Sequence, residues 1–236
     1  MKKRAIICGA SSGIGRATAI ALSKTGCDLV LAARRRALLE ELAAQCEANG
    51  ARALGVPCDI TQYMECEELI SKAKEMEGDA EPVLVNSAGV AEFGDFASTP
   101  VTSLDDQIRT NLMGPVYACR AVIPWILEAG TGHIVNVLSI SATFVFSGAA
   151  AYSASKAGLL MFGKSLAAEY RKKGLRVTSV IPGATDTAIW SHQDFVPSRE
   201  DMLSPETVAE VIRDVILLPN DRSVDEITIM PPKGVL

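Results

Sequence analysis

The feature that most constrains the fold is a regular alternation of short apolar runs with longer amphipathic stretches. The runs are rich in Val, Ile and Leu and have the length of buried strands. They span residues 4–8, 28–32, 53–57, 82–85, 133–138, 176–181 and 226–230. Between them, residues 13–25, 36–49 and 62–77 repeat apolar side chains at helical spacing. This alternation predicts a parallel seven-stranded sheet with helices on both faces, an α/β fold of the doubly wound Rossmann type.

Length and composition fit a single domain that spans residues 1–236. The chain has 236 residues, of which 48% are hydrophobic, and no linker, repeat or low-complexity segment divides it. Its net charge of −5 argues against binding to nucleic acid or to an anionic membrane surface. The N-terminal apolar run is too short for a signal peptide, and no run reaches membrane length. We therefore expect a cytoplasmic protein without nucleic-acid or membrane partners.

The cysteines and histidines offer little material for a metal site. The six cysteines are scattered without a CxxC spacing, so we expect buried apolar residues rather than disulfides or zinc ligands. His133 opens a predicted strand and is expected to be structural, whereas His192 follows a loop and could face a substrate pocket. We predict no metal ligand.

The first predicted strand runs directly into the glycine-rich loop Gly9-Ala-Ser-Ser-Gly-Ile-Gly15, which opens a helix. Glycine permits a tight turn and close approach to a ligand, and free N–H groups at a helix N-terminus bind phosphate. The GxxxGxG spacing differs from the GxGxxG dinucleotide fingerprint, but dinucleotides bind at this first strand–helix turn of doubly wound folds. The predicted cofactor contacts here are Gly9, Ser11, Ser12, Gly13, Ile14 and Gly15.

The residues after the second strand favour NADP(H) over NAD(H). An acidic residue about 20 positions after the loop would bind the 2′-hydroxyl of NAD, but Ala33 stands there and three arginines follow. Cations at the start of a helix oppose its dipole, which an anionic partner would explain. We predict that Arg34 binds the 2′-phosphate; the alternative is solvated arginines, with Arg36 paired to Glu40.

Small and polar residues follow the third, fourth and sixth strands. The carboxyl ends of parallel strands meet at one edge of the sheet, so these residues are expected to converge beside the ligand. Asp59 has two open roles, as an acceptor for the adenine amino group or as a cap for the helix that begins near Gln62. The further predicted cofactor contacts are Asp59, Ile60, Asn86, Ala88, Gly89, Pro182, Gly183, Thr185 and Thr187.

Tyr152 and Lys156 stand four residues apart, so a helix places them on one face. A free tyrosine titrates near pH ~10 and is a poor proton donor at neutral pH unless its phenolate is stabilised. One unit charge at ~4–5 Å supplies roughly 3–4 kcal/mol at an effective dielectric of ~20, which lowers a pKa by about two to three units. The spacing predicts that Lys156 lowers the pKa of Tyr152; the alternative is an ordinary surface pair.

Together these residues resemble the classical short-chain dehydrogenase/reductase family over essentially the whole chain. Ser139 precedes Tyr152 at the spacing that the family has. Two departures, Cys8 for a threonine and Ser87 for an asparagine, do not touch the proton-transfer groups. The matching residues are Gly9 to Gly15, Asp59, Asn86 to Gly89, Asn111, Ser139, Tyr152, Lys156 and Pro182-Gly183.

The resemblance implies an NADP(H)-dependent oxidoreductase that transfers hydride between nicotinamide and a carbonyl or secondary alcohol. Tyr152 would be the general acid in reduction and the base in the reverse direction. Lys156 would lower its pKa and hold the nicotinamide ribose, so both residues also count as cofactor contacts. Ser139 would bind the substrate oxygen, and Asn111 would hold a water that relays protons to Lys156.

Two helical stretches carry further expectations. Residues 104–128 read as one long helix with Pro115 and Pro124, and we expect a bend next to Asn111. Within the predicted helix 151–172, the apolar run 158–162 covers more than one helix face. The resemblance implies that these two helices lie between subunits of a homodimer or homotetramer.

The substrate is the least determined part of the interpretation. The loop at about 185–203, through Trp190, His192, Phe195 and Val196, is expected to form the lid and the substrate wall of a fairly open site. The segment after Val224 resembles sepiapterin-reductase-like and 3-hydroxy-acid or serine dehydrogenases more than ketoacyl-carrier-protein reductases. The alternatives are a catalytically idle NADP-binding sensor or scaffold, a 3-oxoacyl thioester reductase, and an extended-class sugar-nucleotide epimerase or dehydratase, whose chains are longer.

Overall fold

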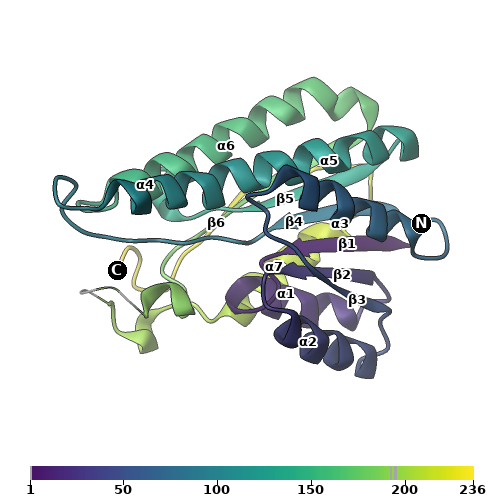
Figure 1. The fold of residues 1–236 in the computed structure, drawn as a ribbon, viewed down its shortest axis with the longest axis horizontal. Coiled ribbons are helices and arrows are strands. Elements are labelled where there is room, and N and C mark those ends of the chain that lie inside the picture. Colours follow the sequence, from purple (N-terminus) through teal and green to yellow (C-terminus); the bar gives the residue numbers. More distant parts are fainter. Residues whose placement is uncertain (1, 192, 194–195) are drawn as a thin grey trace.

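A single sheet of seven parallel strands runs through the chain (Figure 1). A computed structural model describes residues 2–191, 193 and 196–236. The strand order is β3-β2-β1-β4-β5-β6-β7, and every pairing is parallel. The strands are β1 (Lys3–Cys8), β2 (Asp28–Ala33), β3 (Ala53–Pro57), β4 (Glu81–Asn86), β5 (Gly132–Val137), β6 (Leu175–Pro182) and β7 (Glu226–Ile229). The predicted doubly wound α/β fold is confirmed.

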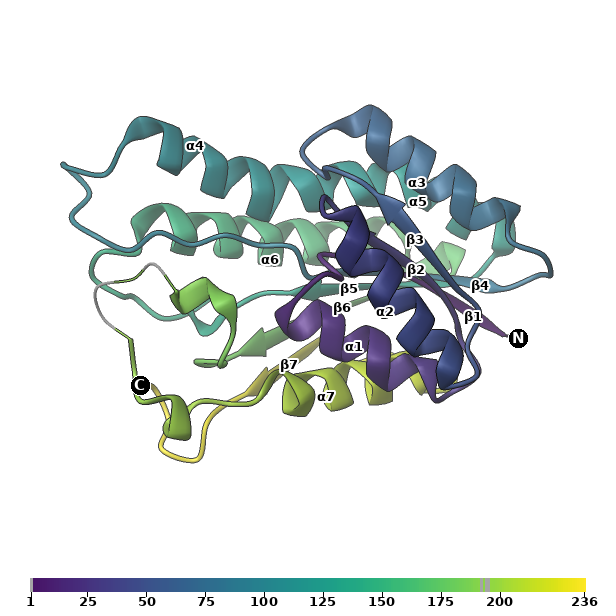
Figure 2. The ribbon, with the colours of Figure 1, turned by 60° about the horizontal axis from the view of Figure 1, so that its bottom comes forward.

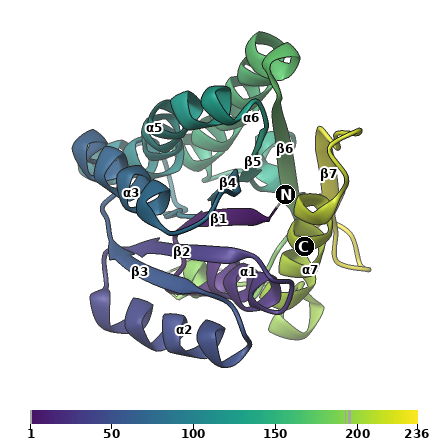
Figure 3. The ribbon, with the colours of Figure 1, turned by 90° about the vertical axis from the view of Figure 1, so that its right-hand side faces the viewer.

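Helices cover both faces of this sheet, as Figure 3 shows end-on. One face carries α1 (Gly13–Ser23), α2 (Arg36–Ala48) and α7 (Pro205–Leu217). The other carries α3 (Tyr63–Glu75), α5 (Gly114–Ala129) and α6 (Ala150–Tyr170). Helix α4 (Val101–Ile108) precedes α5 and packs against α6. Among the described residues, no helix is long and apolar enough to cross a membrane.

The strands read as continuous apolar runs because both faces of each central strand are buried. In β1, Ala5 and Ile7 contact the layer of α1, α2 and α7, whereas Ile6 and Cys8 contact the opposite layer. All four side chains are fully buried. The six cysteines are buried and free, as expected from their scattered positions.

The long helix predicted over residues 104–128 widens beside Asn111. Helix α4 passes into one π-helical turn, Arg109–Met113, and α5 then begins at Gly114. Pro115 stands four residues after Asn111 and has no N–H to donate to the Asn111 carbonyl, which explains why the α-helical turn widens there. Pro124 lies inside α5 without ending it. The predicted helical stretch is therefore present, and the disturbance expected next to Asn111 takes the form of a π-helical turn.

Helix α7 lies outside the helices expected from the sequence. Its N-cap Ser204 accepts a hydrogen bond from Thr207 N at 3.1 Å, and Pro205 occupies the first turn. Val208 and Ile212 are fully buried beside α1. The Ser-Pro start was a readable helix signal, and the helix completes the cover over the strands of the cofactor loop.

The carboxyl ends of the strands all lie at one edge of the sheet. The loops that leave β1, β4, β5 and β6 meet there, and the lid segment after β6 folds over the same edge (Figures 1 and 2). The last residues of the chain return to this edge, whereas the N-terminal end lies at the opposite one (Figure 1). This geometry gathers the predicted site residues from segments that are far apart in the sequence.

Candidate active site

The glycine-rich loop has a backbone that other residues could not adopt. Gly9 and Gly13 have positive φ angles of 84° and 52°. A Cβ at Gly9 would lie 2.5 Å from Ala88 N, and one at Gly15 would lie 2.4 Å from Gly9 O. The loop therefore packs directly on the turn after β4 and on the start of α1, which places two predicted cofactor segments side by side.

This loop fits the phosphates of a dinucleotide. Gly9 N and Ala10 N both donate hydrogen bonds to the Ala32 carbonyl, at 2.9 and 3.1 Å, so they are not available to a ligand. The N-cap of α1, Ser12, has extended backbone and no side-chain capping bond, so the first turn of the helix presents its N–H groups to the loop side. Such a helix start favours an anion through its free donors and its dipole.

The arginines after β2 lie at the outer side of the loop. All three are exposed, and Arg35 Nη2 donates to Ser11 Oγ at 3.0 Å. Arg35 is thus joined to the glycine-rich loop, whereas binding of a 2′-phosphate by Arg34 stays a prediction.

Asp59 lies after β3, where a turn uses one of its oxygens. Asp59 Oδ1 accepts from Thr61 N at 3.0 Å and from Thr61 Oγ1 at 2.8 Å. The N-cap of α3 is Gln62, which has no side-chain cap, so Asp59 shapes the turn before the helix and does not cap it directly. Its role toward the adenine group stays a prediction, as does that of Ile60, which packs against Gly114.

Asn86 and Gly89 mark the turn after β4. Asn86 Nδ2 donates to Asn136 Oδ1 at 2.9 Å in the core, so its side chain joins β4 to β5. A Cβ at Gly89 would lie 3.4 Å from Asn111 Oδ1 and 3.5 Å from Lys156 Nζ. The turn therefore approaches the predicted catalytic residues through backbone atoms.

Asn111 is fully buried at the π-helical turn and its side chain is committed to neighbouring segments. Its Oδ1 accepts from Val90 N and its Nδ2 donates to Val90 O, both at 2.8 Å. Nδ2 also lies 3.1 Å from Ser155 Oγ on α6. The side chain thus ties the turn after β4 to α6, and any bond to a water must come from the backbone carbonyl that Pro115 leaves without its α-helical donor.

Lys156 lies one turn after Tyr152 on α6 and is 5% exposed. Its ammonium donates to the Val137 carbonyl at the end of β5, at 3.0 Å, and lies 5.8 Å from the centroid of the Tyr152 ring. Burial lowers the pKa of Lys156 to about 8. The ammonium therefore sits behind the tyrosine and can lose its proton near neutral pH.

The expected lowering of the Tyr152 pKa by Lys156 is wrong for the chain by itself. Burial raises the pKa of Tyr152 to about 12, and a hydrogen bond with Ser139 opposes this only in part. The four-residue spacing was read correctly, but the ammonium turns to the Val137 carbonyl and not to the phenol oxygen. Tyr152 is thus held as a neutral phenol, the form that can give a proton.

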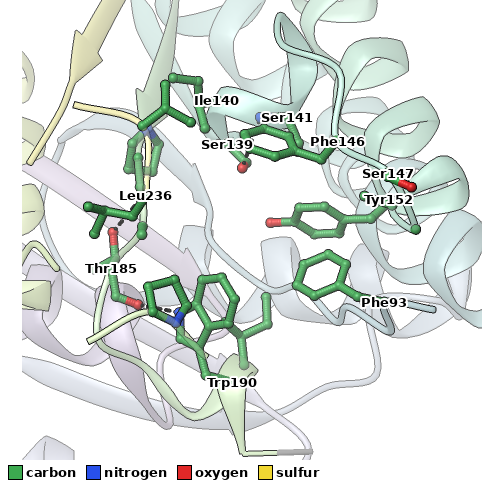
Figure 4. A pocket seen from close by; sticks show the side chains of 18 of the residues that line it. Phe93, Ser139, Ile140, Ser141, Phe146, Ser147, Tyr152, Thr185, Trp190 and Leu236 are labelled. Atoms are coloured by element: carbon green, nitrogen blue, oxygen red, sulfur yellow. Dashed lines mark hydrogen bonds between the residues drawn. The ribbon is translucent and has the colours of Figure 1, made fainter. Parts of the chain in front are cut away.

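Ser139 follows β5 and begins a short helical turn, Ile140–Ala142. Its Oγ accepts from Ser141 N at 3.2 Å and points toward the Tyr152 phenol (Figure 4). Ser141, the nearby rival, also lines the cavity, and its Oγ is buried without a protein partner. The Ser139 hydroxyl and the Tyr152 phenol face the same space, as Figure 4 shows.

Tyr152 and Ser139 lie in the wall of a cavity of about 720 Å³. Ile14 from the glycine-rich loop and four of the predicted residues after β6, Pro182, Gly183, Thr185 and Thr187, line the same cavity. Phe93 and Trp190 complete one side of it (Figure 4). Trp190 was predicted as part of the substrate wall; Phe93 was missed, because its loop meets the lid only in the folded chain. The predicted lid residues His192 and Phe195 lie outside the described residues.

Comparisons with known proteins agree with this arrangement. The family model described as short chain dehydrogenase matches residues 3–194. An uncharacterized oxidoreductase of Staphylococcus haemolyticus is 37% identical over 227 residues, which cover 96% of each chain. The chain belongs to the short-chain dehydrogenase family. This dehydrogenase is thus an oxidoreductase, and its family acts on small-molecule substrates.

Two solved structures match the dehydrogenase over nearly its whole length. An alcohol dehydrogenase from the archaeon Thermococcus sibiricus, complexed with 5-hydroxy-NADP, has a TM-score of 0.92 at 26% identity and covers 100% of this chain and 99% of its own. An actinorhodin polyketide ketoreductase with NADPH has a TM-score of 0.88 at 30% identity and covers 98% and 96%. These complexes support the binding of a nicotinamide cofactor. Among the described residues, no group of acidic, histidine and cysteine side chains could hold a metal ion.

Proposed function

We propose that this short-chain dehydrogenase is an NADP(H)-dependent oxidoreductase that interconverts a carbonyl compound and a secondary alcohol. The observation that carries the proposal is the position of Tyr152. Its phenol and the Ser139 hydroxyl face one cavity that the glycine-rich loop and the segment after β6 also line. A sensor or scaffold would need the glycine-rich loop alone, so this convergence favours an enzyme.

The bound cofactor would supply the hydride, and the residues of this chain handle the substrate oxygen. Ser139 orients the carbonyl oxygen and stabilises its developing negative charge through a hydrogen bond. Tyr152 then gives its proton to that oxygen, because its raised pKa of about 12 keeps it protonated at neutral pH.

Lys156 and Asn111 would replace the proton that Tyr152 gives away. The Lys156 ammonium, with its pKa lowered to about 8, is the nearest buried group that can pass on a proton near neutral pH. Asn111 lies beside it, at the π-helical turn, where its backbone carbonyl could hold a relay water. In the oxidation direction, the proton moves through the same groups in the opposite order, from the alcohol to Tyr152 and then to Lys156.

The preference for NADP(H) over NAD(H) rests on the three exposed arginines after β2. Arg34 and Arg35 begin the segment next to Ser11, where no carboxylate stands at the end of β2 to accept a 2′-hydroxyl. A guanidinium pair would neutralise a 2′-phosphate and bind it in a forked geometry.

A homo-oligomer is also part of the proposal. Helix α6 leaves Met161 62% exposed, and α5 leaves Leu127 37% exposed, although the opposite sides of both helices are buried. A second copy of the chain would cover such apolar side chains. Sedimentation at micromolar protein is expected to give a dimer or tetramer, and a monomer would contradict it.

A screen of NADPH and NADH oxidation over ketones, aldehydes, 3-oxoacyl thioesters, diketones and pterins tests the reaction class. At least one carbonyl class is expected to be reduced, with a higher kcat/KM for NADPH than for NADH. Equal or higher kcat/KM with NADH would overturn the cofactor preference. Tight NADPH binding without turnover on any carbonyl would favour the sensor.

A further inference from the structure

The cavity beside Tyr152 is walled mainly by apolar and aromatic side chains. Apart from the hydroxyls near Tyr152 and Thr185, its rings and aliphatic groups come from the glycine-rich loop, the turn after β4, the loop after β5, the lid and the segment after β7 (Figure 4). They include Phe93, Phe96, Phe146, Ile189, Trp190 and Met230. A substrate body placed here exchanges water for carbon contacts.

The described lining residues bring no cation into this cavity. Their only ionisable side chains are Tyr152 and Asp95, and Asp95 is exposed and negative. The cations that flank the lid already have partners: Arg199 pairs with Asp186, and Lys233 Nζ lies 2.7 Å from Asp201 Oδ1. A substrate carboxylate would therefore lose its water without gaining a counter-charge, which is strongly unfavourable.

Two aromatic rings form the wall next to the reacting oxygen. The Phe93 ring lies 5.5 Å from the Tyr152 ring, nearly perpendicular at 86°, and 5.8 Å from the Trp190 ring. The indole N–H of Trp190 already has an acceptor, because Nε1 donates to Thr185 O at 2.9 Å. The ring surfaces that remain suit an apolar or aromatic partner.

Gln193 holds this wall together across the cavity mouth. Its Oε1 accepts from Phe93 N at 3.0 Å, and its Nε2 donates to Ala91 O at 2.9 Å. Nε2 also reaches Ile189 O at 3.3 Å. One side-chain amide thus fixes the turn that carries Phe93 to the segment that carries Trp190, so the aromatic wall is preformed.

We propose that the substrate of this dehydrogenase is an uncharged ketone with a bulky apolar substituent, best an aryl group, which lies against Phe93 and Trp190. Carboxylate-bearing ketones are poor substrates. Phe93 is the specificity-determining residue, because it contacts both Tyr152 and Trp190 and borders the space next to the reacting oxygen. The inference rests on the proposed carbonyl reduction by NADPH.

A matched set of ketones tests the substrate class. The rates of NADPH oxidation are measured with acetophenone, methyl 4-acetylbenzoate, 4-acetylbenzoate and 2-butanone. Acetophenone and the methyl ester are expected to have similar kcat/KM values. The carboxylate, which differs from the ester in charge, and 2-butanone, which lacks the ring, are each expected to be at least about 100-fold poorer.

Variants at Phe93 then test whether this residue determines the preference for acetophenone over 2-butanone. Phe93→Ala is expected to reduce the ratio of kcat/KM for acetophenone over 2-butanone by about tenfold or more, and Phe93→Leu, which keeps apolar volume, by less. Phe144→Ala is the control, because the Phe144 ring is 54% exposed on a neighbouring loop and does not line the cavity. It is expected to leave the ratio unchanged.

The outcomes separate this inference from the function on which it rests. Reduction of 4-acetylbenzoate as fast as its ester, or of 2-butanone as fast as acetophenone, would overturn the substrate class and leave carbonyl reduction intact. An unchanged ratio in Phe93→Ala would overturn the role of Phe93. Failure of every carbonyl compound, with NADPH bound, would overturn the proposed function itself.

Discussion

The amino ends and the carboxyl ends of the strands, here called the amino edge and the carboxyl edge of the sheet, differ in whether a buried charge has an oppositely charged partner. At the amino edge, Glu81 is 1% exposed and lies 2.7 Å from both Lys3 Nζ and Arg176 Nη2. At the carboxyl edge, Lys156 is also buried, but the acceptor of its ammonium is the uncharged Val137 carbonyl. The first edge compensates its charges, and the second leaves a charge without a carboxylate beside it.

The pKa values follow this difference. Burial would raise the pKa of Glu81, but the hydrogen bonds from Lys3 and Asn220 and the charges of Lys3 and Arg176 together outweigh it, and the pKa is lowered. At the other edge, burial alone lowers the pKa of Lys156 to about 8, and that of Tyr152 is raised to about 12. Removing one partner of a compensated buried pair destabilises the fold, whereas an uncompensated buried charge itself costs stability and leaves a group that can exchange protons.

The largest expected effect on stability comes from breaking the amino edge. Glu81→Gln leaves the buried Arg176 and the partly buried Lys3 without their carboxylate, so the free energy of unfolding is expected to fall by about 3–5 kcal/mol in urea titrations. Glu128→Gln is the control, since it removes a surface pair with Lys74 and is expected to cost less than about 1 kcal/mol. Equal losses in the two variants would remove the distinction between compensated and surface charge.

Removing the uncompensated charge of Lys156 at the carboxyl edge is expected to raise stability at neutral pH, whereas breaking the amino edge lowers it. Because the folded pKa of Lys156 (about 8) lies below its ordinary value of 10.5, burying the ammonium lowers stability at pH 7, and this cost disappears as the pH rises from 8 to 10.5. We therefore compare the free energy of unfolding of Lys156→Met with that of wild type, both without ligand. This difference is expected to favour the variant by about 2–3 kcal/mol more at pH 7 than at pH 10.

Lys164→Met serves as the control for this pH dependence. Lys164 is half exposed and pairs with Glu226 on the surface, so its replacement is expected to give the same difference from wild type at both pH values. Any pH-independent cost of replacing Lys156 cancels when the same two proteins are compared at both pH values. A pH-independent difference for Lys156→Met would mean that its ammonium is not destabilised in the fold.

The smallest expected effect concerns the lid. Gln193→Ala removes the amide that joins the turns of Phe93 and Trp190, so kcat/KM for acetophenone is expected to fall about tenfold, or about 1.4 kcal/mol, with little change in stability. Gln45→Ala, which loses a bond to Arg16 on the far helices, is the control. If both variants keep wild-type kcat/KM, the wall does not depend on this clamp.

The sequence could predict the sheet and the groups that converge at its carboxyl edge. Strands such as β1 are buried on both faces, so their apolar runs are continuous and easy to recognise. The glycine-rich loop could be read because Gly9 and Gly15 leave no space for a side chain. Helix α7 was missed although its Ser204 cap and Pro205 start were present.

Directions of side chains and contacts between distant loops could not be predicted. The spacing of Tyr152 and Lys156 gives a shared face but not the acceptor of the ammonium, which the fold supplies from β5. Phe93 and Gln193 are 100 residues apart, and they meet only because β4 and β6 lie on either side of β5.

The measurement that tests the central claim most directly is the turnover of Tyr152→Phe at equal NADPH saturation. The substitution removes one oxygen from a ring whose packing against Phe93 is kept. NADPH affinity, followed by cofactor fluorescence, is expected to match wild type, whereas kcat for the best ketone falls about 10²–10⁴-fold, because proton transfer is lost. A variant with near-wild-type kcat would contradict the assignment of Tyr152 as the proton donor.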